Sequence, residues 1–186
     1  MSILSTHKDS VREFTRRVHA IQPGSEWDLP TPCEGWSVRD LVNHVAYGDL
    51  WVRPLLEGKT LEEVGDRFEG DVLGDDPVTG YEHAADDAVL AASQADLGAK
   101  VHTSGGLIDS TEYLAQRVMD NLVHAWDLAR AIGANEDFDP ELVRFVLDMV
   151  EPHGGGPPGM FDEPVHVEDD GGDEMTKLLA LFGRRM

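Results

Sequence analysis

The sequence of 186 residues predicts an all-α fold, an antiparallel four-helix bundle followed by a C-terminal helical tail. Apolar residues recur at three- and four-residue steps in four long segments, prolines and glycines interrupt the chain between them, and no segment shows a convincing strand alternation. The length suits one well-buried core. We therefore expect a single domain over residues 1–186, with the bundle in 1–134 and the tail in 135–186.

The composition excludes several classes of protein. The net charge of −21, from 36 acidic and 15 basic residues, opposes close approach to nucleic-acid phosphates or anionic lipid. Cys33 is the one cysteine, so no intramolecular disulfide can form. Residues 1–21 lack the apolar core of a signal peptide, and no apolar run reaches the length of a membrane span. We expect a soluble, cytoplasmic monomer or homodimer with no nucleic-acid and no membrane partner.

The first helix is expected over residues 4–21, with Ser5 or Thr6 as its N-cap. His7 and His19 lie in this segment, and neither has an acidic or histidine partner at ligand spacing. We therefore expect both histidines at the surface or edge of the bundle.

The second helix is expected after an ordered turn. Residues 27–36 contain two prolines, a glycine and two tryptophans, which excludes a regular element. Ser37 is expected to cap the helix, with Asp40 in the capping-box position. His44 falls on the apolar face, where a histidine is more often a hydrogen-bonded core residue than a ligand. Gly48, one turn later, leaves room beside the imidazole ring.

The middle of the chain contains fewer sequence patterns that predict secondary structure. We expect Pro54 and Gly58 to end the second helix. Residues 57–79 are acidic and dotted with glycine, which predicts a loop with at most a short helical turn. Alanines at helical steps predict the third helix over residues 81–97, and a loop is expected at residues 98–106.

The fourth helix is expected over residues 110–133, between a start signal at Asp109 and a left-handed terminator at Gly133. It is apolar around most of its circumference, which is typical of a helix buried on several sides. Its polar face carries Asp120 and His124 one turn apart, where they can bind one metal ion or share one proton. A solvated pair on an amphipathic helix is the alternative that the spacing alone favours.

The tail is expected to contain two further helices. Residues 139–141 supply an N-cap, a first-turn proline and an acid, and they predict a fifth helix. Residues 154–159 predict an irregular break, and a last short helix is expected over residues 175–182. Glu163 and His166 fit a Glu-x-x-His motif, but a proline lies between them and di-iron bundles need the motif on two helices. We therefore discount a metal site there.

The bundle would bring His44 of the second helix to Asp120 and His124 of the fourth. Two imidazoles and one carboxylate with an open position are the arrangement of catalytic zinc, and the same donors suit nickel, cobalt or iron(II). Asp127 is a candidate for orienting or polarising a ligand. Cys33 is a candidate nucleophile, although a small packing residue is the favoured interpretation because free cysteine is commonly buried.

Three stretches resemble a known family: TPCEGWSVRDLVNHV at residues 31–45, NLVHAWDLARAIG at residues 121–133 and LLALFGR at residues 178–184. The first two look like the mycothiol-dependent maleylpyruvate isomerase N-terminal-domain family of the DinB-like metalloprotein superfamily. The third looks like the tail of its small actinobacterial members. The resemblance implies a DinB-like four-helix bundle that binds a divalent metal, often zinc.

Carried over residue by residue, the metal ligands of the family fall on His44, Asp120 and His124. The isomerase has glutamate where this chain has Asp120, and the shorter aspartate leaves two alternatives, binding through water or supporting the ligands without touching the metal. In characterised relatives the metal activates the thiol of a cofactor such as mycothiol or bacillithiol for isomerisation or S-transfer. The resemblance therefore implies a metal- and thiol-dependent transferase or isomerase with a small-molecule substrate, and it does not imply maleylpyruvate isomerisation.

Two other hypotheses stay open. The chain is a non-catalytic metal-binding or partner-binding protein if its acidic surface and the turn that contains Cys33 serve association. It is a bundle without a metal if its histidines only form hydrogen bonds within the core.

Overall fold

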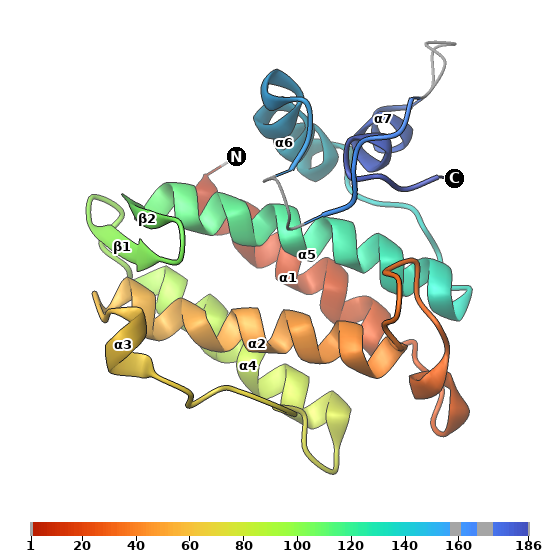
Figure 1. Ribbon diagram of the computed structural model, residues 1–186, viewed down its shortest axis with the longest axis horizontal. Helices are drawn as coiled ribbons and strands as arrows, with labels where there is room; N and C mark the ends of the chain where they lie inside the picture. The colour runs from red at the N-terminus through yellow and green to blue at the C-terminus, as the bar shows by residue number, and fades with distance from the viewer. Residues whose placement is uncertain (1, 157–160, 167–172, 186) are drawn as a thin grey trace. The chain divides into compact units, whose positions relative to one another are not determined.

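The computed structural model describes residues 2–156, 161–166 and 173–185, and helices dominate it (Figure 1). The predicted all-α bundle is confirmed. The chain groups into two compact units, Met1–Asn135 and Glu136–Met186, and each is described by itself. That the whole chain forms one domain stays a prediction. Among the described residues, no helix is both long and apolar enough to cross a bilayer.

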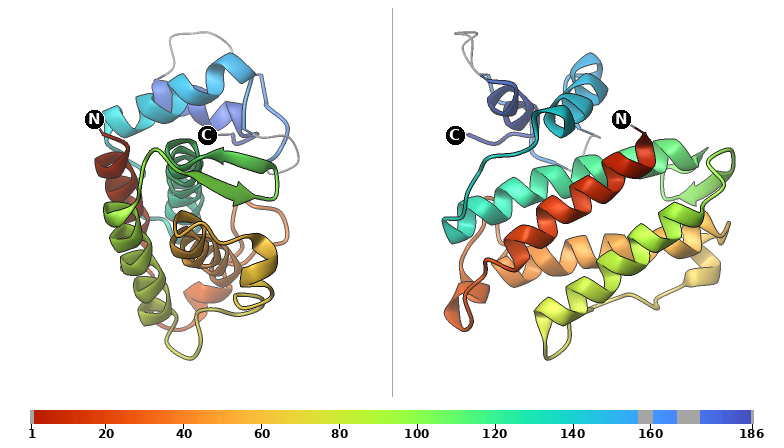
Figure 2. Two further views of the ribbon diagram at one scale, coloured as in Figure 1. Left: turned by 90° about the vertical axis from the view of Figure 1, so that its left-hand side faces the viewer. Right: turned by 180° about the vertical axis from the view of Figure 1, so that it is seen from behind.

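Four long helices build the first unit: α1 (Ile3–Val18), α2 (Val38–Leu56), α4 (Pro77–Gln94) and α5 (Ser110–Ile132). α1 packs against α5, and α2 packs against α4. Contacts of α2 with α5 and of α1 with α4 close the ring, as the end-on view shows (Figure 2). Because α2 lies beside α5, side chains far apart in the sequence can share one site.

The start of α2 is the predicted capping box. The backbone N–H of Asp40 donates to Ser37 Oγ (3.2 Å), and the backbone N–H of Ser37 donates to Asp40 Oδ2 (2.9 Å). The hydroxyl of Ser37 also donates to Asp40 Oδ2 (2.6 Å), and this bond, followed by that from the Ser37 N–H, lowers the pKa of Asp40. The cap predicted for α1 is wrong, because Ser2 rather than Ser5 or Thr6 caps that helix.

The end of α2 falls between Pro54 and Gly58, the two residues predicted to end it. The helix continues to Leu56, and the N–H of Glu57 donates to the carbonyl of Arg53 (2.9 Å). A proline removes one N–H from the ladder, but its ring is buried in the core here and the last turn keeps its other hydrogen bonds. Gly58, at φ 82°, follows in the left-handed region and ends the turn.

The segment between α2 and α4 contains α3 (Leu61–Val64), which is the short helical turn predicted there. α4 starts at Pro77, four residues before the predicted start at residue 81. Asp76 caps it by accepting a hydrogen bond from the N–H of Thr79 (3.3 Å), and proline suits the first helical position because its missing N–H would have no partner.

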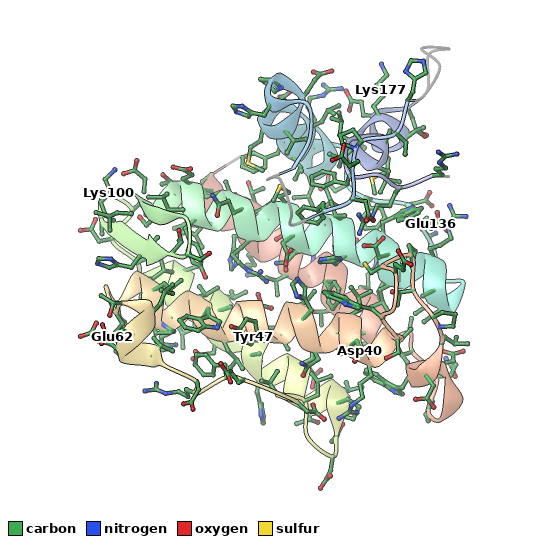
Figure 3. The ribbon with its side chains drawn as sticks, viewed as in Figure 1. Asp40, Tyr47, Glu62, Lys100, Glu136 and Lys177 are labelled. Atoms are coloured by element: carbon green, nitrogen blue, oxygen red, sulfur yellow. The ribbon has the colours of Figure 1, made fainter. Side chains whose placement is uncertain are left out.

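A hairpin occupies much of the loop predicted at residues 98–106. β1 (Lys100–Thr103) pairs antiparallel with β2 (Gly106–Asp109) around Ser104-Gly105. Lys100 is exposed at the start of β1 (Figure 3). Strands of four residues are too short for a clear period-two pattern, and the sequence prediction missed them for this reason.

His7 is completely buried, so its predicted place at the surface or edge is wrong. It lies four residues before Val11 in the apolar stripe of α1, and neither ring nitrogen has a hydrogen-bond partner among the described residues. Burial, with a smaller contribution from the charge of Arg117, lowers the pKa of His7 to about 4. The prediction for His19 is confirmed, because its side chain is exposed and lies 2.7 Å from Glu82.

The described residues of the second unit form three elements: α6 (Pro140–Val150), the 3-10 turn η2 (Glu151–His153) and α7 (Glu174–Leu181). Asp139 caps α6 as predicted, and α7 packs against α6. Of the predicted irregular break, residues 157–159 lie outside the described residues. Glu163 and His166 are in non-helical backbone, which agrees with discounting their motif.

Candidate metal centre

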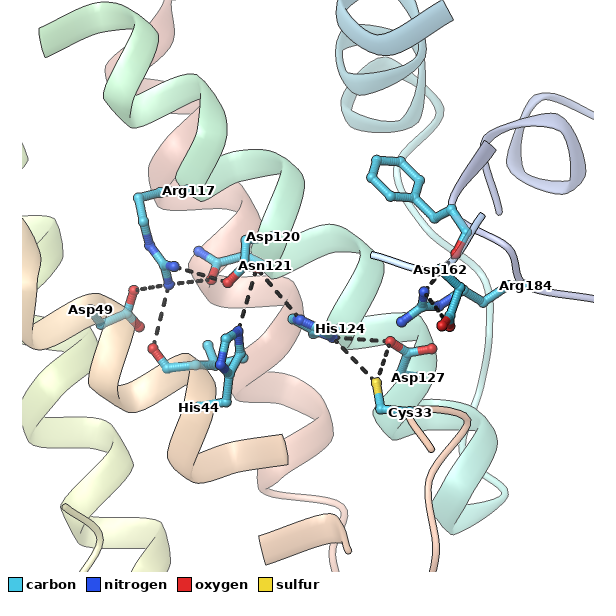
Figure 4. A network of polar contacts seen from close by, with 12 residues as sticks. Cys33, His44, Asp49, Arg117, Asp120, Asn121, His124, Asp127, Asp162 and Arg184 are labelled. Atoms are coloured by element: carbon cyan, nitrogen blue, oxygen red, sulfur yellow. Dashed lines mark hydrogen bonds and ion pairs between the residues drawn. The ribbon is translucent and has the colours of Figure 1, made fainter. Parts of the chain in front are cut away.

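Side chains of α2 and α5 meet between the two helices (Figure 4). His44 Nε2 lies 3.6 Å from Asp120 Oδ1, and His124 Nε2 lies 3.5 Å from the same oxygen. One ligand atom from each of the three residues lies within 4.8 Å of the other two. The fold therefore brings together the three residues selected from the sequence, while metal binding by them stays a prediction.

The spacing of these atoms is compatible with a metal site. N–H···O hydrogen bonds are usually about 2.7–3.2 Å long. Two ligand atoms at about 2.1 Å from a tetrahedral ion lie about 3.4 Å apart. The observed 3.5 and 3.6 Å are close to the second value. Two imidazole nitrogens and a carboxylate oxygen are ligands for zinc, and also for nickel, cobalt and iron(II).

The site has one exposed edge. Asp120 and His124 are buried, whereas 38% of the His44 side chain is exposed. His44 therefore lies at the rim of the site, and the sequence prediction that it lies inside the bundle is wrong. The half-buried indole of Trp36 lies over both imidazoles, with ring centroids 4.8 Å from His44 and 6.2 Å from His124. The His44 side chain is therefore in contact with solvent, while the Trp36 ring lies next to both imidazoles.

Arg117 binds the second oxygen of Asp120. Its Nη1 donates to Asp120 Oδ2 (2.9 Å), and its Nη2 donates to Asp49 Oδ1 (3.0 Å). A Cβ added at Gly48 would lie 2.3 Å from Arg117 Nη1. The room at Gly48 is therefore occupied by this guanidinium and not by the histidine ring, which corrects the sequence prediction. The arrangement leaves Asp120 Oδ1 for the two imidazoles.

The electrostatics of the site favour a cation. Burial raises the pKa of Asp120, but Arg117 and His124 more than offset burial and hold this pKa well below its usual value. Burial lowers the pKa of His124, but the charge of Asp120 and several hydrogen bonds raise it well above its usual value. Burial also raises the pKa of Asp49 to about 6, against the opposing effect of Arg117. Positive charge beside Asp120 is therefore stabilised.

Asp127 and Cys33 lie on the far side of His124. Asp127 Oδ2 is 3.0 Å from His124 Nδ1, the arrangement in which a carboxylate fixes the tautomer and orientation of a metal-binding imidazole. Cys33 Sγ is 3.3 Å from Asp127 Oδ2 and 3.9 Å from His124 Nδ1. Cys33 therefore lies beside the site, and both roles considered from the sequence, nucleophile and small packing residue, stay predictions.

Sequence reasoning missed Arg117 and Asp49 as parts of the site. Arg117 lies three residues before Asp120 on the same polar face, and this spacing was the available signal. The sequence signal for Asp49 was weaker. It is a carboxylate in a largely apolar helix, and such a group needs a cationic partner if it is buried.

Comparison with known proteins agrees with this fold. Residues 7–129 match the family described as the mycothiol maleylpyruvate isomerase N-terminal domain. Two uncharacterised proteins from two strains of Mycobacterium tuberculosis are each 28% identical over 184 residues, which is 93% of this chain and 92% of theirs.

Solved structures show the same bundle. The crystal structure of the mycothiol-dependent maleylpyruvate isomerase aligns with a TM-score of 0.63 at 19% identity, over 84% of this chain and 74% of that one. A variant of that isomerase with a histidine replaced by alanine aligns with the same score at 18% identity. The likeness confirms the DinB-like fold. By the match over residues 7–129, the chain belongs to the mycothiol maleylpyruvate isomerase N-terminal domain family.

Proposed function

We propose that this protein binds a divalent metal ion, zinc foremost, through His44 Nε2, Asp120 Oδ1 and His124 Nε2. We further propose that it is a transferase or isomerase that uses a low-molecular-weight thiol and a small-molecule substrate. The observation that carries the proposal is the separation of 3.5 and 3.6 Å between the two imidazole nitrogens and one carboxylate oxygen. Family membership supports it independently.

Bound there, a divalent metal ion supplies Lewis-acid chemistry and lowers the pKa of a thiol or water that reaches it. The residues of the chain prepare the site for that role. With an ion bound, Asp127 would accept the Nδ1 proton of His124, so that Nε2 gives up its own proton and holds the ion. Arg117 holds Asp120 by its other oxygen, and the indole of Trp36 keeps water from one side of the rings.

The thiol is proposed from the relatives. The solved structure with the same fold is a mycothiol-dependent enzyme, which supports mycothiol or a similar thiol as the cofactor. The exposed edge at His44 supports an approach from solvent. In this arrangement the thiol reaches the open position without any displacement of the buried pair on α5.

Metal analysis of protein purified without a histidine tag tests the site. All proteins in this test carry Cys33→Ser, because that thiol lies 3.9 Å from His124 Nδ1 and could itself bind zinc. In this background we expect one equivalent of zinc to bind, and His44→Ala to bind it at least about tenfold more weakly, because one of three ligands is lost. His19→Ala is the matched control, since that imidazole is exposed and lies outside the site. Equal zinc affinity in all three proteins would overturn the proposal.

Calorimetry tests the use of a thiol. Mycothiol is expected to bind zinc-loaded wild type with release of a proton, detected as heats that depend on the ionisation enthalpy of the buffer. Neither the zinc-free protein nor His44→Ala should show this release. Tight zinc binding with no uptake of mycothiol would instead favour a non-catalytic metal-binding protein.

A further inference from the structure

The imidazole of His124 has ligand atoms on both sides. Its Nε2 faces the His44 and Asp120 site, whereas its Nδ1 lies 3.0 Å from Asp127 Oδ2 and 3.9 Å from Cys33 Sγ. Sγ and Oδ2 are 3.3 Å apart, and the three atoms all lie within 4.8 Å of one another. A thiol, an imidazole and a carboxylate from two separate segments therefore converge (Figure 4).

We propose that Cys33 Sγ, His124 Nδ1 and Asp127 Oδ2 form a second metal site, for a thiophilic divalent cation such as zinc or cobalt(II). Around a tetrahedral ion with a metal–sulfur distance of about 2.3 Å and nitrogen and oxygen at about 2.1 Å, ligand atoms lie about 3.4–3.6 Å apart. The observed 3.0, 3.3 and 3.9 Å need shifts of only a few tenths of an ångström. The sulfur makes this site softer than the first one.

The backbone around Cys33 holds the sulfur in place. The N–H of Cys33 donates to Thr31 Oγ1 (3.2 Å), and its carbonyl accepts from the N–H of Trp36 (3.0 Å). The N–H of Thr31 donates to the carbonyl of Trp36 (3.0 Å), which closes the turn. The sulfur lies against Asp127 and His124, so the turn fixes it beside α5.

The two sites share one imidazole and therefore exclude each other. A neutral imidazole has one N–H and one lone pair, so His124 serves either the first site through Nε2 or the second site through Nδ1. Loading the second site releases the thiol proton of Cys33 to solvent and requires the His124 proton to be on Nε2. One chain thus binds one ion, in one of two positions, and the second position does not require the first to be loaded.

Cobalt(II) titration in thiol-free buffer tests this site directly. A thiolate ligand gives cobalt(II) a charge-transfer band in the near ultraviolet, and Cys33 is the only cysteine in the chain, so this band reports the second site alone. His44→Ala weakens the first site and leaves the second complete. We expect this variant to bind one equivalent of cobalt with the band, at an intensity equal to or above that of wild type.

Cys33→Ser in the His44→Ala background is the matched control, and it should lose the band and bind cobalt at least tenfold more weakly. Asp120→Asn serves in place of His44→Ala if circular dichroism shows that the latter is misfolded. The proposal is overturned if cobalt binds without the band, if cobalt does not bind the variant at all, or if the band per chain fades on dilution, which indicates ligation between chains. Failure of the first site alone would leave the band of the variant unchanged, so the two proposals fail separately.

Discussion

The guanidinium of Arg117 on α5 occupies the space that Gly48 leaves open on α2. A Cβ at residue 48 would lie 2.3 Å from Nη1 and 2.6 Å from Cζ of this arginine. From this place Arg117 reaches both Asp49 and Asp120. A missing side chain on one helix therefore positions a candidate metal ligand on the other.

Gly48→Ala is expected to destabilise the fold by about 2 kcal/mol and to weaken zinc binding about tenfold or more. Alanine favours a helix over glycine by about 1 kcal/mol, but breaking a buried ion pair costs about 3–5 kcal/mol. Urea unfolding and zinc titration measure the two effects. Gly105→Ala is the control, because a Cβ there meets only Thr103 Oγ1 at 3.8 Å. Similar results for both variants would contradict the role of Gly48.

Asp120→Asn is expected to lower the pKa of His124 in the metal-free protein. Burial lowers this pKa, and the charge of Asp120 is the largest of the effects that raise it. Without that charge, the lowering of the pKa by burial is offset less, and the imidazolium loses its proton at a lower pH. Titration followed by NMR measures the change, with the exposed His19 as an internal control. If His124 titrates as in wild type, the electrostatic account of the site is incorrect.

His7 should make the protein less stable as the pH falls. Its pKa is about 4 in the folded state, against 6.5 for an unperturbed imidazole. Between these values the unfolded chain binds the proton and the folded chain does not, so stability decreases on acidification, by about 3 kcal/mol at pH 4.

His7→Phe removes this group. The free energy of unfolding of wild type minus that of the variant should therefore decrease by about 3 kcal/mol from pH 7 to pH 4. Denaturant unfolding at both pH values measures it, and the subtraction cancels the titration of other groups. A difference that does not change with pH would show that His7 is protonated equally in both states.

Ser37→Ala should lower the free energy of unfolding by about 1 kcal/mol, because the capping box at the start of α2 loses its hydroxyl. The pKa of Asp40 should rise in the variant, since hydrogen bonds from Ser37 are what lower it. Thermal unfolding measures the stability, and Ser93→Ala, at an exposed position late in α4, is the control. A smaller loss of thermal stability in Ser37→Ala than in Ser93→Ala would contradict a stabilising role of the capping box.

Helix boundaries that depend on local hydrogen bonds were predictable from the sequence. Ser37 with Asp40, Gly133 and Asp139 each mark an end that the structure has, because caps involve residues only a few positions apart. Pro54 marks the end of α2 only to within two residues, because a proline near a helix end removes one hydrogen bond and leaves the packing of that turn intact.

Partners across helices were not predictable. The periodicity of α1 selects a buried stripe, yet it does not show that His7 itself belongs to it. The space at Gly48 was visible in the sequence, but a single helix does not show which residue of another helix enters it. His44, Asp120 and His124 were found because two local motifs coincide in one family, whereas Arg117 binds through a contact that only the packed bundle creates.

Asp120 and His124 stand one turn apart on α5, so their separation persists wherever that helix is intact. The distance to His44 instead depends on how α2 lies along α5. If α2 slid along α5, the imidazole of His44 would move away from Asp120 and His124, while these two residues would keep their separation. At the proposed metal site, ion affinity would therefore be coupled to interhelical register, and by reciprocity any molecule that prefers a shifted register would bind less well to protein loaded with the ion.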